Sequence, residues 1–128
     1  MENVVYQYKL LIFATSFSQV HKYRATKFIC TIYHDTATNN DFEKCDDLIV
    51  FNNDTKKIEL YGSKVITYDI IRYDSTLKEK DGSETQRALC LDDLGVKCFL
   101  YFIQDSDGKS LVIDYSNNRY AYIIEQEK

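Results

Sequence analysis

His21 and His34 are the only histidines in the chain, and a histidine is the usual base for a serine or cysteine nucleophile. Cys30 precedes His34 by four residues, so on a strand the two side chains would share a face, separated by two same-face steps. That spacing is too loose for a nucleophile–base pair. We interpret His34 as a surface residue at a strand end, and the sequence predicts a protein without enzymatic activity.

The segment DSDG at residues 105–108 resembles the opening of a calcium-binding loop. The twelfth position of such a loop must supply a bidentate carboxylate, and here that position is Ser116. The segment is therefore predicted to be a hairpin turn. The four glycines are spread singly along the chain, with no phosphate-binding loop among them, so no metal or cofactor is expected.

Charge is distributed unevenly along the chain. Residues 1–34 contain four basic residues and one acidic residue (4 − 1 = +3), so residues 35–128 carry −4 − 3 = −7. Lys22, Tyr23, Arg24 and Lys27 interleave cations with an aromatic ring, a pattern that can hold phosphates while it stacks on bases. Residues 21–28 are therefore a candidate RNA contact. The simpler interpretation is a solvated loop that leads into a strand.

An acidic segment follows. Asp41, Glu43, Asp46 and Asp47 lie in residues 35–47, which are predicted to form the longest loop of the protein. Such a loop can dock on a basic partner and steer its association. The alternative is that these carboxylates are simply solvated.

Tyrosine is the third candidate for a binding function. The chain has eleven tyrosines and seven phenylalanines but no tryptophan. Tyrosine on a sheet surface supplies large contact area at an interface. Aromatic residues can also line the mouth of a ligand-holding barrel. The sequence leaves both possibilities open.

These side chains must be positioned by strands, because the apolar residues occur in short alternating runs separated by turn residues. The predicted strands are 25–34, 48–51, 57–61, 65–73, 85–91, 96–104, 111–115 and 120–124, and residues 6–13 form either a ninth strand or the start of a helix. Eight or nine antiparallel strands predict a single all-β domain over residues 1–128. A small barrel is the favoured closure and a sandwich the alternative.

One hairpin can be predicted in register. If residues 93–95 form a three-residue loop with Gly95 left-handed, then Leu91 faces Lys97 and Cys90 faces Cys98. The facing cysteines would fall on a hydrogen-bonded pair, where the Cα atoms are farther apart than at the alternate sites. A packed thiol pair is therefore expected here rather than a disulfide.

Composition and the N-terminal segment limit the cellular location and the functional class of the protein. The net charge of −4 is too mild for a DNA mimic and excludes a wholly basic nucleic-acid coat. Residues 1–18 make a poor signal peptide, because Glu2 and Lys9 leave no net positive charge before a short apolar stretch. A cytoplasmic location with reduced cysteines is expected; a periplasmic or secreted location is the alternative if that segment acts as a signal.

From residue 48 to about residue 125, the order of strand and turn motifs resembles a group of small, mostly uncharacterised all-β proteins of Bacteroidetes. The motifs are LIVF at 48–51, KIELY at 57–61, YDI at 68–70, KDG at 80–82, LCLDDLGVKC at 89–98 and LVIDYSN at 111–117. Members of that group usually begin with a signal peptide and often carry a tryptophan near the end, where this chain has RYAY at 119–122. The resemblance implies a β fold and supplies no activity.

The leading hypothesis for function is a small binding protein that acts by occupying a macromolecular partner. Its sharpest form is an inhibitor, encoded by a phage or mobile element, of a bacterial nuclease or an RNA-guided (CRISPR-type) defence complex. The alternative is a carrier that holds a small molecule inside the barrel.

Overall fold

The computed structural model describes residues 20–33 and 41–127, which form nine strands and no helix. The strands are β1 (Val20–Ile32), β2 (Glu43–Asn52), β3 (Lys57–Tyr61), β4 (Val65–Tyr73), β5 (Leu77–Lys78), β6 (Glu84–Leu91), β7 (Lys97–Asp105), β8 (Gly108–Asp114) and β9 (Asn118–Gln126). The described residues contain no helix long and apolar enough to span a membrane. The predicted strand or helix at residues 6–13 lies outside the described part of the chain.

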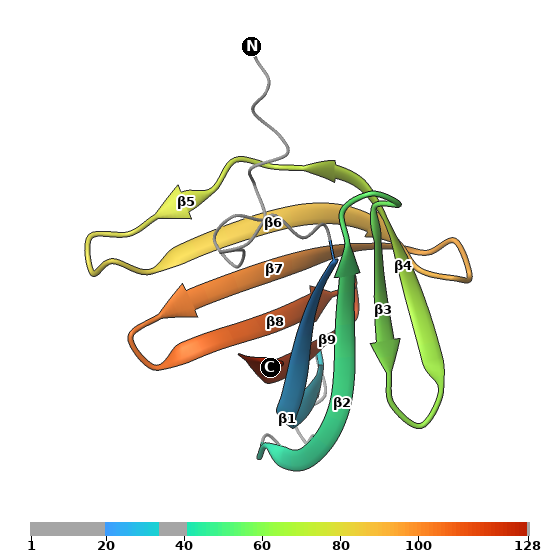
Figure 1. Cartoon of the computed structure of the whole chain (residues 1–128), viewed down its shortest axis with the longest axis horizontal. Helices are drawn as coiled ribbons and strands as arrows, with labels where there is room; N and C mark the ends of the chain where they lie inside the picture. The colour runs from blue at the N-terminus through green and yellow to red at the C-terminus, as the bar shows by residue number, and fades with distance from the viewer. Residues whose placement is uncertain (1–19, 34–40, 128) are drawn as a thin grey trace.

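Eight of the strands close into an antiparallel barrel. Each pairs with its neighbour in sequence, β4 pairs with β6, and β1 pairs with β9 to complete the circle. The two-residue strand β5 adds to the edge of β6 beyond the β4–β6 contact. In Figure 1, β6, β7 and β8 cross β2, β3 and β4 at a steep angle. The predicted all-β barrel is confirmed.

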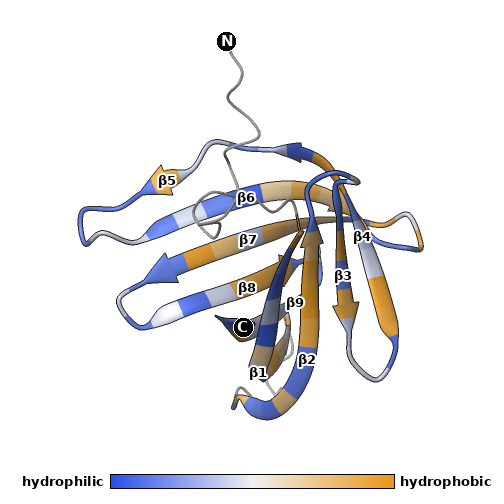
Figure 2. Ribbon diagram, viewed as in Figure 1, coloured by the Kyte–Doolittle hydropathy of each residue, from blue (hydrophilic) through white to orange (hydrophobic). Residues whose placement is uncertain are grey.

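Alternation of side chains along each strand explains why these segments fold this way. In β7, Cys98, Leu100 and Phe102 are buried, whereas the residues between them are half-buried on the outer face. This period of two is the strand signature on which the sequence prediction relied. Figure 2 shows the resulting bands of hydrophilic and hydrophobic residues along the strands, with hydrophilic residues prominent in most of the turns.

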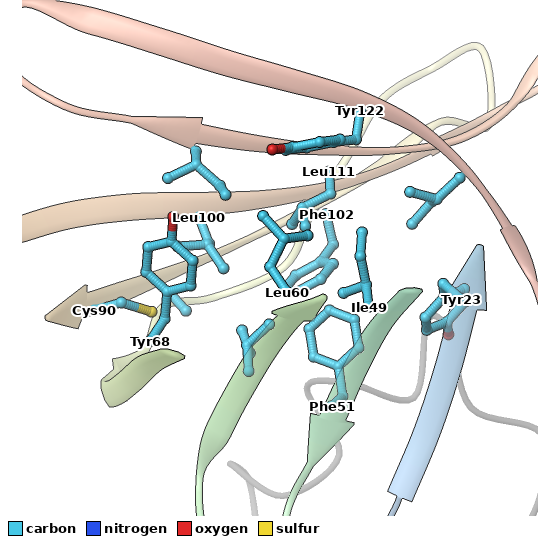
Figure 3. Close-up of a cluster of buried hydrophobic side chains, with 14 of the residues drawn as sticks. Tyr23, Ile49, Phe51, Leu60, Tyr68, Cys90, Leu100, Phe102, Leu111 and Tyr122 are labelled. Atoms are coloured by element: carbon cyan, nitrogen blue, oxygen red, sulfur yellow. The ribbon is translucent and has the colours of Figure 1, made fainter. Parts of the chain in front are cut away.

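The barrel interior is filled by side chains. The ring of Phe51 meets that of Phe102 edge-on at 4.5 Å between centroids, and that of Tyr23 at 5.6 Å. Figure 3 shows Ile49, Phe51 and Leu60 from one side of the barrel packed against side chains of the opposing strands. The core therefore joins the two groups of strands across the barrel.

Two boundaries predicted from the sequence were wrong. β1 begins at Val20, so the basic segment is a strand and not a solvated loop. β2 begins at Glu43, so the predicted loop of residues 35–47 is strand from Glu43 onward. In β1 and β2, charged residues on the outer face alternate with inward-facing ones such as Tyr23 and Ala25. Because so many residues of these segments are charged, the alternation was not recognised in the sequence.

The β6–β7 hairpin has the predicted register. Leu91 pairs with Lys97 and Cys90 pairs with Cys98, and Gly95 has a φ of 79°, in the left-handed region that favours glycine. Both cysteines are buried free thiols, as expected for a packed thiol pair. The DSDG segment is the β7–β8 turn, also as predicted.

Candidate binding site at the tyrosine end

One end of the barrel carries a tyrosine-lined pocket. We call it the tyrosine end: it comprises the β3–β4, β6–β7 and β8–β9 turns, the last residues of β1 and the first of β2. The pocket has a volume of about 480 Å³, within the range of small-ligand sites. Its wall includes four tyrosines from three elements, namely Tyr68, Tyr115, Tyr120 and Tyr122.

Two of these rings form a corner. Tyr115 and Tyr120 meet at 90° with their centroids 6.1 Å apart. Phe28 of β1 supports the corner from behind, since its ring stacks on Tyr120 at 6.1 Å and lies 5.1 Å from Tyr122. The aromatic faces are thus held by other rings before any ligand arrives.

Asp92 anchors the pocket to the β6–β7 turn. One carboxylate oxygen accepts hydrogen bonds from the backbone N–H groups of Leu94 and Val96, both at 2.9 Å. The other accepts the hydroxyl of Tyr115 at 2.8 Å. Partial burial opposes ionisation, but these three hydrogen bonds outweigh it and lower the pKa of Asp92. Asp92 is therefore an anion at neutral pH and fixes the Tyr115 ring.

The same network extends into the barrel. Tyr115 also interacts with Tyr68 and with the Cys98 thiol, as the coupling of their pKa values indicates. Burial, followed by the hydrogen bond to Asp92, raises the pKa of Tyr115, so this phenol keeps its proton. The arrangement holds the tyrosines in place and leaves no phenolate to act as a base.

Exposed apolar side chains lie at the same end of the barrel as the pocket, and two of them, Val65 and Leu94, line it. Ten large hydrophobic residues of the described chain are exposed, and six of them lie at the tyrosine end: Ile32, Phe42, Tyr61, Val65, Leu94 and Val96. Leu94, at 85%, is the most exposed of the ten. Exposed apolar side chains gathered in one place mark an interaction surface, whereas singly scattered ones do not.

The structure places one of the predicted acidic residues against a turn of this end. Asp47 lies against Gly62 of the β3–β4 turn, where an added Cβ would stand 3.0 Å from a carboxylate oxygen of Asp47. The charge of Asp47 also contributes to the raised pKa of Tyr122, one of the pocket tyrosines. Burial, then repulsion from Asp46, raises the pKa of Asp47 itself.

The predicted basic site lacks its aromatic member. Tyr23 is completely buried in the core and cannot stack on a base, which corrects its assignment as a contact residue. Arg24 is paired with Asp46 at 3.3 Å and with Glu127 at 2.9 Å. Lys22 and Lys27 remain exposed on the outer face of β1.

Among the predicted acidic residues, as among the basic ones, some are paired and others are exposed. Asp46 is paired with Arg24, and Glu43 opposite Phe28 is an exposed strand residue. Asp41 is exposed just before β2. Because β1 and β2 are neighbours, the basic and acidic segments lie side by side and partly neutralise each other. The two segments are separate in the sequence, so their mutual neutralisation is visible only in the structure.

The candidate nucleophiles and bases of the described residues are poorly placed for catalysis. His21 is 6% exposed inside the barrel, and burial lowers its pKa. Burial raises the pKa of Cys98 to about 11, and that of Cys90 also rises, so both remain thiols at neutral pH. Within residues 20–33 and 41–127, no group of three or more metal-ligating side chains could hold an ion.

This burial leads to a prediction about thiol reactivity. In the native protein at pH 8, partly exposed Cys30 should react with a thiol reagent, and Cys45 more slowly, because burial raises the pKa of its thiol. Cys90 and Cys98 should react only after denaturation, because they are buried and keep their protons. Mass spectrometry of peptides from the labelled protein identifies which cysteines are modified. Equal labelling of all four in the native state would contradict the buried thiol pair.

Comparison with known proteins adds no family to this picture: no protein-family model matches the chain, and no curated protein or solved structure does. The pocket must be interpreted from its own residues. The number of tyrosines is evident from the sequence, but the meeting of four of them at one end of the barrel is not. A signal was present in the sequence, because Tyr115 ends one predicted strand (111–115) and Tyr120 begins the next (120–124).

Proposed function

We propose that this protein is a non-enzymatic binding protein that occupies a protein partner through its tyrosine end. The observation that carries the proposal is the presence of six exposed apolar side chains at the same end of the barrel as the tyrosine-lined pocket, two of which, Val65 and Leu94, line the pocket itself. Tyrosine-rich, apolar patches with a partly polar edge are typical of interface centres. The sharpest form of the proposal remains an inhibitor of a bacterial nuclease or an RNA-guided defence complex in the cytoplasm.

Several features support a protein partner over RNA. Aromatic stacking through Tyr23 is unavailable because that ring is buried, and Arg24 already contacts two carboxylates. Asp92 and Asp93 at the pocket would repel phosphates. A basic surface on the partner, such as the nucleic-acid channel of a nuclease, is favoured by the overall charge of −4.

The carrier hypothesis has less support. A carrier would enclose its ligand inside the barrel, whereas here side chains such as Phe51, Leu100 and Phe102 occupy that space. The pocket at the tyrosine end lies at the surface and is edged by exposed residues such as Leu94 and Asp93. This geometry suits a projecting group on a larger partner better than an enclosed free ligand.

Site-specific photo-crosslinking tests the proposal. A photo-reactive amino acid at Leu94 should crosslink one protein in a bacterial lysate, and the same amino acid at Leu77 on β5 should not. Leu77 is a matched control, because it is also an exposed leucine but lies away from the tyrosine end. The captured protein should then bind the purified wild-type chain and lose affinity for the L94D variant. No crosslink at Leu94, or equal crosslinking from both positions, would overturn the proposal.

A further inference from the structure

We propose that the tyrosine-lined pocket receives one cationic side chain, the ammonium of a lysine or the guanidinium of an arginine that projects from the partner. This inference rests on the proposed function, because it names the chemistry that the tyrosine end recognises. Three features of the pocket carry it: the aromatic corner, the excess of carboxylates, and an apolar edge that suits the stem of such a side chain.

The aromatic corner provides ring surface for a cation, since Tyr115 and Tyr120 both line the pocket. The rings of Tyr115 and Tyr120 stand perpendicular to each other, with centroids 6.1 Å apart. A cation within about 6 Å of an aromatic centroid is attracted by the negative face of the ring. An ammonium or guanidinium group in the pocket therefore lies beside aromatic rings that can attract it.

The charges around the pocket favour a cation. Asp92 and Asp93 line it, against one basic residue, Lys64. Asp47 adds a third carboxylate nearby, beside Gly62 and close enough to affect Tyr122. Asp92 stays ionised because its hydrogen bonds lower its pKa. A positive group placed at the corner would therefore be attracted by both the rings and the carboxylates.

The apolar edge fits the rest of the side chain. Val65, Ile66 and Leu94 line the same pocket. Lysine and arginine bury their methylene stems along apolar surface while the charged group stays near polar atoms or water. The pocket thus offers an apolar contact for the stem and an anionic, aromatic contact for the charged group.

The arrangement is also fixed in advance. Tyr115 is held by Asp92, Tyr120 by the stacked ring of Phe28, and Asp92 itself by the backbone of its own turn. A ligand that binds groups already in position loses little affinity to ordering them. A single projecting side chain can therefore contribute strongly to binding of the whole partner.

The test uses isolated side-chain analogues and the full chain. N-acetyl-arginine amide and N-acetyl-lysine amide are titrated into protein with 13C-labelled tyrosine rings, observed by NMR and assigned with single Tyr→Phe variants. Both compounds should shift the Tyr115 and Tyr120 signals, with affinities of about 1–10 mM, as expected for one side chain. N-acetyl-citrulline amide, a neutral analogue of similar shape to the arginine compound, should bind at least about five-fold more weakly.

Charge variants sharpen the result. D93N should weaken binding of the arginine compound about two- to five-fold, and K64Q should strengthen it by a similar factor. D107N, at the β7–β8 turn of the opposite end, should change nothing. Equal binding of the citrulline compound, or no shift of the pocket tyrosines, would overturn the cationic assignment.

The two proposals fail differently. If Leu94 still crosslinks a partner but the cationic compounds do not bind, the tyrosine end is an interface and the pocket chemistry is wrong. If the cationic compounds bind but Leu94 captures no partner, the pocket chemistry holds and the proposed partner does not.

Discussion

Replacing Phe102 with alanine should lower the free energy of unfolding by about 3–5 kcal/mol. Phe102 is completely buried, and its ring lies 4.5 Å from that of Phe51 across the barrel. The substitution removes apolar surface from the core and leaves a cavity that a closed barrel cannot readily collapse. Since small domains have total stabilities of about 5–15 kcal/mol, urea unfolding should show a large drop in midpoint.

F42A is the matched control for this experiment. Phe42 is 47% exposed at the tyrosine end, so the same change in side chain should alter stability by less than about 1 kcal/mol. Comparable losses for the two variants would mean that the interior is not packed as described.

Replacing Asp92 with alanine should cost about 1–3 kcal/mol. The carboxylate accepts two backbone N–H groups of its turn and the Tyr115 hydroxyl, and alanine accepts none of them. D93A serves as the control, because Asp93 is the exposed neighbour in the same turn. Chemical unfolding of both variants at pH 7 gives the difference, and similar stabilities would contradict the anchoring role of Asp92.

This stabilisation should also depend on pH. The folded-state pKa of Asp92 is lowered, so its contribution is complete above the unfolded pKa of about 4 and is lost as the pH falls through the folded value. The gap in stability between wild type and D92A should therefore narrow below about pH 4. A gap that stays constant down to pH 2 would rule out the charged hydrogen bonds as its source.

Much of the barrel could be predicted from the sequence because its β3–β9 region, the short strand β5 apart, alternates regularly. The β6–β7 hairpin was predicted to the residue, since a glycine fixed the turn and the turn fixed the facing cysteines. The two-residue strand β5 was missed because it is too short to show any alternation.

The errors concern contacts between segments. The basic and acidic segments each looked like a binding surface in isolation, and only the β1–β2 pairing shows that Arg24 is matched by Asp46. Tyr23 looked accessible because its neighbours are charged, but strand alternation turns its ring inward. The tyrosine end is likewise assembled from turns far apart in sequence, so its pocket could not be inferred from any local motif.

Closure of the barrel by β1 and β9 has a consequence for how the chain folds. The ion pair between Arg24 and Glu127 joins residues 103 positions apart, and the strand pairing beside it is equally distant. To form contacts between residues so far apart in sequence, the chain must first lose the conformational entropy of the loop between them. This entropy cost slows folding. During synthesis, β1 must wait for the last strand to leave the ribosome. Until then its edge is open, and that nascent stage is when this chain is most exposed to aggregation.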